Sequence, residues 1–112
     1  MTSRREVDIQ KSCLQYLSMV QGGFFDRCNT GAVVGEYKGR KRFTRFGTPG
    51  QADIVGCYRG RYVSFEVKRD KGRQNPNQVE FERRVNSAGG FYRVVRSVGD
   101  VIAAIKELEG NK

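Results

Sequence analysis

Residues 51–68 read QADIVGCYRGRYVSFEVK, and this stretch decides the fold. Its two halves, residues 51–58 and 61–68, are rich in β-branched and aromatic residues, as strands are. The only turn-forming break between them is Arg59-Gly60. A two-residue break of this kind predicts a tight antiparallel hairpin.

The hairpin register brings two acids and a lysine together. A two-residue loop pairs Tyr58 with Arg61, and counting outward places Asp53 opposite Glu66. Opposed residues have Cβ atoms roughly 4.5–5.5 Å apart, close enough for two carboxylates to bind one divalent cation. Lys68 follows Glu66 by two residues and so lies on the same face, unless the hairpin slips by one residue.

Two carboxylates at this distance repel each other unless a cation or a proton neutralises one of them. The pattern therefore indicates a hard metal ion bound by Asp53 and Glu66. The alternative is an exposed cross-strand salt bridge in which Lys68 pairs with both acids.

Composition limits the domain count and the class of partner. The chain has 112 residues, which predicts a single domain spanning 1–112. It carries 21 Lys and Arg against 12 Asp and Glu, with no histidine and a net charge of +9, so a polyanion such as nucleic acid is the expected partner. An acidic membrane surface is disfavoured, because the basic residues do not line one face of an amphipathic helix.

The cysteines and the N-terminal sequence bear on the compartment. Cys13, Cys28 and Cys57 form no CxxC pair, and no histidine could complete a zinc site, so they are expected to be small core residues in a reducing compartment. The opening MTSRREVD leads into no long apolar run. We therefore expect neither a signal peptide nor a membrane span, and a cytosolic protein.

The first predicted helix runs from Ser3 to Val20, where its apolar residues recur at helical spacing. Glu6 falls inside the apolar stripe, where an acid is unusual. The local pattern favours a capping box, in which Glu6 reaches back to the backbone amide of Ser3. The other interpretation gives Glu6 a role in a functional site.

Phe24 to Asn29 is predicted to be a strand, and the glycine-rich stretch Thr30 to Gly50 is predicted to contain a loose hairpin. Aromatic residues alternate there with cations, a composition that suits contacts with phosphates. A solvated ribbon kept soluble by its charges is the alternative. The cations concerned are Lys38, Arg40, Lys41, Arg42 and Arg45.

A second basic patch, formed by Arg69, Lys71 and Arg73, follows the hairpin. Asn75-Pro76 then begins a helix. Gln78 lies on the apolar face of that helix, and two interpretations remain equal: it points into a site, or it completes a capping box with Asn75.

The remaining chain predicts a strand, Phe91 to Val95, and a last helix capped by Ser97. The order is helix, antiparallel strands, helix, strand, helix. This order predicts an α/β sandwich.

An acid on one strand, followed across a tight turn by acid-x-lysine, resembles the metal-dependent nucleases of the PD-(D/E)xK superfamily. More narrowly, the sequence resembles the VRR-NUC family in its short stand-alone phage and bacterial form. The resemblance includes Glu6, Arg27 and Asn29, and it covers nearly the whole chain through the segments GTPGQADIVG, GRYVSFEVK, NQVEFERRV and GGFYRVV. One departure is Ala52-Asp53, where the superfamily has proline before the aspartate.

The resemblance implies a restriction-endonuclease-like core with a central mixed sheet flanked by helices. It also implies that Asp53 and Glu66 hold Mg²⁺ or Mn²⁺, with the Val67 carbonyl as a backbone ligand. Lys68 would position or activate the attacking water and stabilise charge on the phosphate.

Two further residues gain a role from the resemblance. Gln78 matches the glutamine that follows the acid-x-lysine motif, and Glu6 matches a helical acid that acts as a water-mediated or second-metal ligand. For these two residues the resemblance favours the site over the capping box.

The sequence therefore predicts a divalent-metal-dependent DNA endonuclease that acts on duplex or branched substrates. The resemblance adds that stand-alone relatives resolve four-way (Holliday) junctions as homodimers. The alternatives are a non-catalytic basic nucleic-acid-binding module and a flap or nicking nuclease with the same centre.

Overall fold

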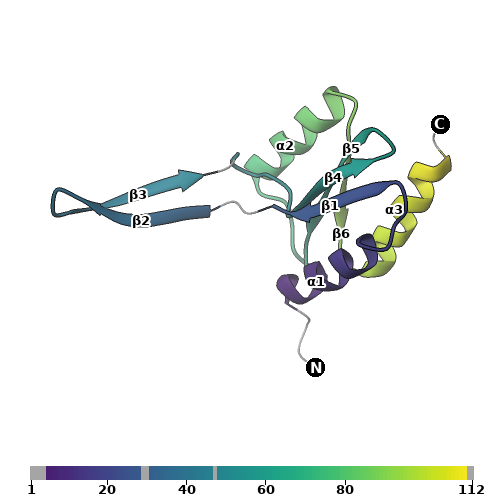
Figure 1. Ribbon diagram of the computed structural model, residues 1–112, viewed down its shortest axis with the longest axis horizontal. Helices are drawn as coiled ribbons and strands as arrows, with labels where there is room; N and C mark the ends of the chain where they lie inside the picture. The colour runs from purple at the N-terminus through teal and green to yellow at the C-terminus, as the bar shows by residue number, and fades with distance from the viewer. Residues whose placement is uncertain (1–4, 29–30, 47, 111–112) are drawn as a thin grey trace.

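A mixed four-stranded sheet forms the centre of the molecule (Figure 1). The computed structural model describes residues 5–28, 31–46 and 48–110, and for 31–37 and 40–46 it describes the backbone alone. The strand order is β1-β4-β5-β6, with β5 and β6 parallel and the other neighbours antiparallel. The bounds are β1 Gly23–Arg27, β4 Ile54–Tyr58, β5 Arg61–Val67 and β6 Phe91–Val95.

The β4–β5 hairpin has the register predicted from the sequence. Tyr58 lies opposite Arg61, and the ladder continues to Ile54 opposite Phe65. Arg59 and Gly60 have φ values of 48° and 85°, the two positive angles that a type I′ hairpin turn requires. The tight turn therefore sets the register of the whole hairpin.

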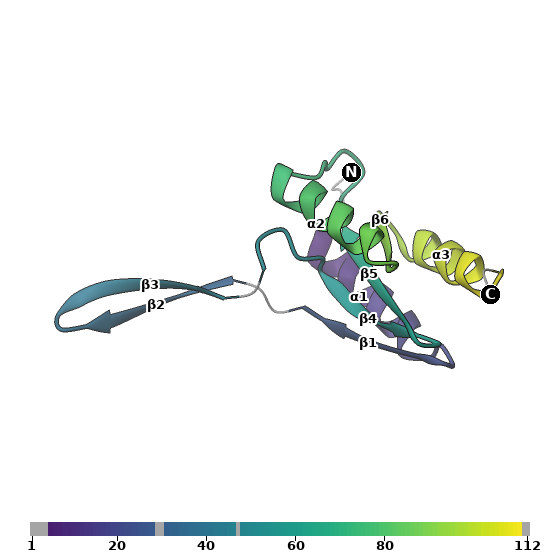
Figure 2. The ribbon, with the colours of Figure 1, turned by 90° about the horizontal axis from the view of Figure 1, so that it is seen from above.

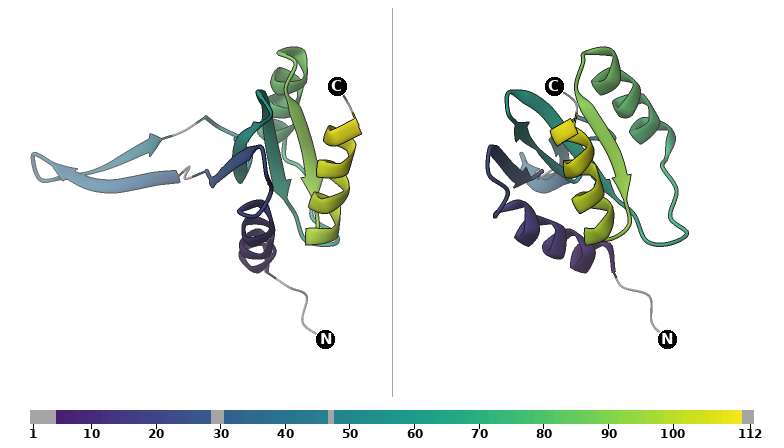
Figure 3. Two further views of the ribbon diagram at one scale, coloured as in Figure 1. Left: turned by 45° about the vertical axis from the view of Figure 1, so that its right-hand side comes forward. Right: turned by 90° about the vertical axis from the view of Figure 1, so that its right-hand side faces the viewer.

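Three helices cover the two faces of the sheet. The helices α1 (Glu6–Leu17) and α3 (Val98–Gly110) lie next to each other on one face, where the main core is buried (Figure 3). The helix α2 (Pro76–Ser87) covers part of the other face, over a smaller cluster formed by Ala52, Val85 and Tyr92. The predicted α/β architecture, a mixed sheet flanked by helices, is confirmed.

The connection from β5 through α2 to β6 places the end of β5 near the start of α2. The segment that leads into β4 passes against the same helix end: a Cβ atom on Gly50 would lie only 2.2 Å from the backbone oxygen of Asn77. Gly50 also has a φ of +77°, which side-chain-bearing residues rarely adopt. The chains around the start of α2 are therefore closely packed.

A two-stranded ribbon projects from this body (Figures 1 and 2). It consists of β2 (Gly31–Tyr37) and β3 (Arg40–Phe46), which are antiparallel, with Gly31 opposite Phe46 and Tyr37 opposite Arg40. The turn residues Lys38 and Gly39 both have positive φ. The hairpin predicted between Thr30 and Gly50 is thus a regular β-ribbon.

Two sequence-based expectations need correction. The first helix begins at Glu6 and ends at Leu17, so it is shorter than predicted, because the chain tightens into a turn in which the Val20 amide bonds to the Leu17 carbonyl. Cys13 is buried as expected, but Cys28 is only half-buried and Cys57 is exposed. Because side chains two residues apart on a strand point to the same side, Cys57 lies on the face of β4 that carries Val55. It stands at a position that α2 leaves uncovered.

The described part of the chain contains no helix with the length and apolar character needed to span a membrane.

The cap predicted for the last helix is present, since the Asp100 amide donates to the Ser97 hydroxyl at 3.3 Å.

Candidate active site

The acid pair and the lysine come together where the β4–β5 hairpin ends. Asp53 stands one residue before β4, in continuation of the ladder, and its Oδ2 accepts a hydrogen bond from the Val67 amide at 2.8 Å. Glu66 is only 2% exposed. The Lys68 Nζ lies 3.8 Å from Glu66 Oε2. The predicted parity of these three residues is therefore present in the structure.

The backbone around Asp53 is held from both sides. The Cys28 amide donates to the Asp53 carbonyl at 2.7 Å, which extends the β1–β4 pairing by one residue. The preceding residue, Ala52, is 1% exposed and packs in the cluster beneath α2. Ala52 thus anchors the chain directly before Asp53.

The Glu66 carboxylate is the unusual group of the site. Burial, and next the charge of Asp53, raise the pKa of Glu66 to about 9, with a smaller contribution from Glu6 and an opposing one from Lys68. Its Oε1 is buried and has no hydrogen-bond partner within the described part of the chain. A buried, unsatisfied carboxylate oxygen is costly and calls for a ligand.

Gln78 has both of the roles that the sequence left open. Its Oε1 accepts from the Asn75 amide at 2.9 Å, and the Asn75 side chain accepts from the Gln78 amide at 2.9 Å, which completes the capping box. Its Nε2 donates to Glu66 Oε2 at 3.1 Å. The two ends of one amide thus cap the helix and orient the acid.

Glu6 does not form the expected cap in the part of the chain that is described. Arg5 occupies the N-cap position, and Ser3, the predicted partner, lies outside the described residues. Instead Glu6 Oε2 accepts from the backbone amide of Arg69 at 3.3 Å, next to the end of β5. Glu6 is therefore near the acid pair without joining it in a compact cluster.

The donors suit a hard divalent cation. Among the described residues no three Asp, Glu or Cys side chains gather into a metal-binding group. Asp53 and Glu66 do provide paired carboxylate oxygens, one of them buried without a partner. Mg²⁺ commonly binds through one or two carboxylates and keeps several waters, so two acids are sufficient.

The basic loop after Lys68 is held by a residue that the sequence analysis missed. Arg69, Lys71 and Arg73 are exposed on this loop. The half-buried Arg96, which directly follows β6, reaches under the loop. The Arg96 Nη1 donates to the carbonyls of Arg69 at 2.6 Å, Gly72 at 2.8 Å and Asp70 at 3.3 Å. A single arginine after a strand carries no sequence pattern that would have revealed these hydrogen bonds.

For four of the five cations predicted on the ribbon, the structure gives the backbone position alone. Lys38 is exposed in the turn, whereas the side chains of Arg40, Lys41, Arg42 and Arg45 are outside what the structure describes. Asn29, named with the family resemblance, also lies outside the described residues. Phosphate contacts by the ribbon therefore remain a prediction.

Comparison with known proteins bears on the fold. No family model matches the sequence, and no curated protein matches it. A solved structure described as a VRR_NUC domain matches with a TM-score of 0.62 and 23% sequence identity, covering 90% of this chain and 94% of that one. The resemblance noted in the sequence is thus confirmed in three dimensions, and the fold of this chain is that of a VRR_NUC domain.

Proposed function

We propose that this chain is a divalent-metal-dependent DNA endonuclease of the VRR-NUC family, which hydrolyses phosphodiester bonds. The observation that carries the proposal is the convergence of Asp53, Glu66 and Lys68 at the end of one hairpin, with a buried Glu66 oxygen that lacks a partner. A salt bridge on the surface would not explain it, because the Glu66 side chain is 3% exposed and the Lys68 side chain 12%.

Asp53, Glu66 and the Val67 carbonyl would hold the ion. Oxygen donors favour Mg²⁺ or Mn²⁺ over zinc. When bound, such an ion supplies Lewis-acid stabilisation of phosphate charge and a nucleophile at neutral pH. Gln78 holds the Glu66 carboxylate in one orientation through its 3.1 Å hydrogen bond. The amide of Val67 does the same for Asp53.

Lys68 provides a positive charge beside the acid pair. Its ammonium lies against Glu66, where it can hold the attacking water and stabilise the negative charge that builds up on the phosphate. The chain contains no histidine, so no imidazole can serve as a base. Glu6, bonded to the Arg69 amide at the edge of the site, would act through water.

DNA binding is assigned to the two basic patches. Arg69, Lys71 and Arg73 are exposed directly beside the site, and their loop is held in one shape by Arg96. The ribbon would provide further phosphate contacts through the cations predicted there. A net charge of +9 suits such a polyanionic substrate.

We further propose, from the family resemblance, that the substrate is a four-way junction and that the active form is a homodimer. Two symmetric cuts require two active sites in a fixed relation. Incubation with Mg²⁺ and matched linear, flapped and four-way DNA tests this point. Faster cleavage of the junction supports it, and equal rates on all three substrates reject it.

The nuclease assignment itself is tested with Asp53→Asn. We expect cleavage to be lost while DNA binding is kept or strengthened, because a negative charge near the phosphate is removed. Glu109→Gln, which removes one negative charge from the exposed end of α3, is the matched control and should cleave normally. Full cleavage by Asp53→Asn would reject Asp53 as part of the cleavage site, and no cleavage by wild type with DNA binding intact would leave only a nucleic-acid-binding module.

A further inference from the structure

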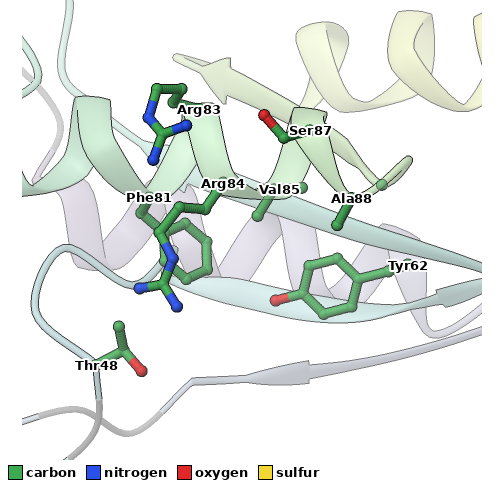
Figure 4. A pocket seen from close by; sticks show the side chains of 9 residues that line it. Thr48, Tyr62, Phe81, Arg83, Arg84, Val85, Ser87 and Ala88 are labelled. Atoms are coloured by element: carbon green, nitrogen blue, oxygen red, sulfur yellow. The ribbon is translucent and has the colours of Figure 1, made fainter.

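A separate cavity lies between α2 and β5, on the same face of the sheet as the acid pair (Figure 4). Its volume is about 620 Å³, in the range of sites that bind small molecules. Asp53, Glu66 and Lys68 do not line it. The residues that line it and bear on the argument are Thr48, Tyr62, Phe81, Arg84 and Val85.

The cavity opens beside a row of exposed aromatic surface. Tyr62 is 43% exposed and Phe24 is 74% exposed, large values for aromatic residues on a sheet. Phe24 pairs with Cys57, and Cys57 pairs with Tyr62, so the two rings stand on one face two strands apart. At about 4.8 Å between strands, their backbones are roughly 10 Å apart.

A cation stands at the cavity, on the side of Phe81 and Thr48 (Figure 4). In Figure 4 the Arg84 side chain extends from α2 over the opening, with the Tyr62 ring below the helix. Arg83 is occupied by an ion pair with Glu80, whereas Arg84 makes no ion pair within the described part of the chain. Arg84 is close enough to Glu80 to help lower the pKa of that carboxyl, but the ion pair of Glu80 is with Arg83. An arginine that bonds to no carboxylate, at a cavity with aromatic residues, suits a ligand with both a phosphate and a flat aromatic face.

We propose that this cavity binds one unpaired nucleotide of the DNA substrate, with its base stacked on Tyr62 and its phosphate at Arg84. That this nucleotide belongs to a DNA substrate rests on the proposed function. A base can stack on a side chain only when it has left the duplex stack, so the cavity would read unpaired positions at a branch or a frayed end.

The distance between the cavity and the acid pair fits this use. Tyr62 and Glu66 lie four residues apart on the same face of β5, which corresponds to roughly 13 Å at about 3.3 Å per residue. Stacked nucleotides rise about 3.4 Å each along one strand. A nucleotide held at Tyr62 therefore lies within about four steps of the phosphate at Glu66.

The test measures binding without cleavage, in EDTA, by fluorescence anisotropy. The probes are a labelled oligothymidine of about eight nucleotides, within the usual range of single-strand sites, and an abasic oligomer of equal length and charge. We expect wild type to bind the oligothymidine about tenfold more tightly. Tyr62→Ala should abolish this preference, and Tyr62→Phe should retain it.

Arg84→Gln should weaken binding of both probes alike and lower the salt dependence by about one unit. Lys106→Gln, the same charge change at an exposed position on α3, should weaken binding less. If Tyr62→Ala does not fold by circular dichroism, Tyr62→Leu replaces it, since leucine keeps apolar bulk without an aromatic face.

Equal binding of the two probes by wild type, or a preference that survives removal of the Tyr62 ring, would overturn the proposal. Tighter binding of an oligouridine than of the oligothymidine would assign the cavity to RNA and reject the DNA nucleotide. Because no cleavage is involved, an active nuclease without base preference would reject the cavity alone, and a base preference without cleavage would reject the nuclease alone.

Discussion

Gln78 Nε2 donates a hydrogen bond to Glu66 Oε2 across 3.1 Å, and this contact joins the first turn of α2 to the last residues of β5. The same side chain accepts from the Asn75 amide through its Oε1. Helix capping and orientation of the acid are thus coupled in one residue. Loss of the Gln78 side chain would therefore affect both the helix cap and the orientation of one of the two proposed metal-binding carboxylates.

The two functions of Gln78 can be separated by mutation. Asn75→Ala should cost about 1 kcal/mol in urea unfolding through loss of the cap, with cleavage per folded molecule nearly unchanged. Gln78→Ala should cost a similar amount and also lower single-turnover cleavage by tenfold or more, a rough figure based on what an orienting partner contributes. Equal cleavage by the two variants would show that the contact with Glu66 is dispensable.

Mg²⁺ should raise the melting temperature. A ligand that binds only the folded chain stabilises it by mass action, by about 2.7 kcal/mol at a hundred times its Kd. Thermal denaturation at increasing Mg²⁺ measures the shift, and Asp53→Asn should remove most of it because one of two carboxylate ligands is lost. A shift of the same size in Asp53→Asn would place the bound ion elsewhere.

In EDTA the stability should fall as the pH rises from about 5 to about 9. Burial raises the pKa of Glu66 to about 9, while an unfolded glutamate has a pKa near 4.5. Between these values the folded chain holds a proton that the unfolded chain releases, so stability is fully present below pH 4.5 and is lost as the pH approaches 9.

Glu66→Gln isolates the contribution of Glu66 to the pH dependence of stability, because an amide of similar shape does not titrate. Urea unfolding across the pH range should give a flatter profile for the variant, which should exceed wild type in stability at about pH 8. A variant profile parallel to that of wild type would show that another group causes the pH dependence.

Arg96→Ala should loosen the basic loop after Lys68. The change removes a donor that contacts three loop carbonyls, at 2.6, 2.8 and 3.3 Å. We expect faster amide hydrogen exchange in residues 69–74, unchanged exchange in β4 and β5, and weaker DNA binding. The orphaned carbonyls would cost on the order of 1–3 kcal/mol if they are not rehydrated.

Arg93→Ala is the control for that experiment. Arg93 lies on β6, three residues before Arg96, and pairs with Glu107, but this pair is 42% and 47% exposed and should contribute under about 1 kcal/mol. Exchange in the loop should not change in this variant. Equal loosening by both variants would mean that loss of a positive charge, and not the Arg96 contact, is responsible.

Some of the site was outside the reach of sequence reasoning. Glu6 and Arg69 are 63 residues apart in the chain, and their contact depends on how α1 packs at the end of β5. The local capping pattern favoured Ser3 as the partner of Glu6, because only neighbours are visible in a sequence. The exposure of Cys57 likewise depends on how far α2 extends over the sheet.

The sequence by itself determined the hairpin register. A two-residue turn at Arg59-Gly60 and a side-chain period of two place Asp53, Glu66 and Lys68 on one face, since both rules act between near neighbours. The tertiary structure alone decided that Gln78 reaches Glu66, that Arg96 holds the basic loop and that a cavity opens beneath α2. These contacts join separate elements, and their geometry follows from how whole helices and strands pack, which no local pattern encodes.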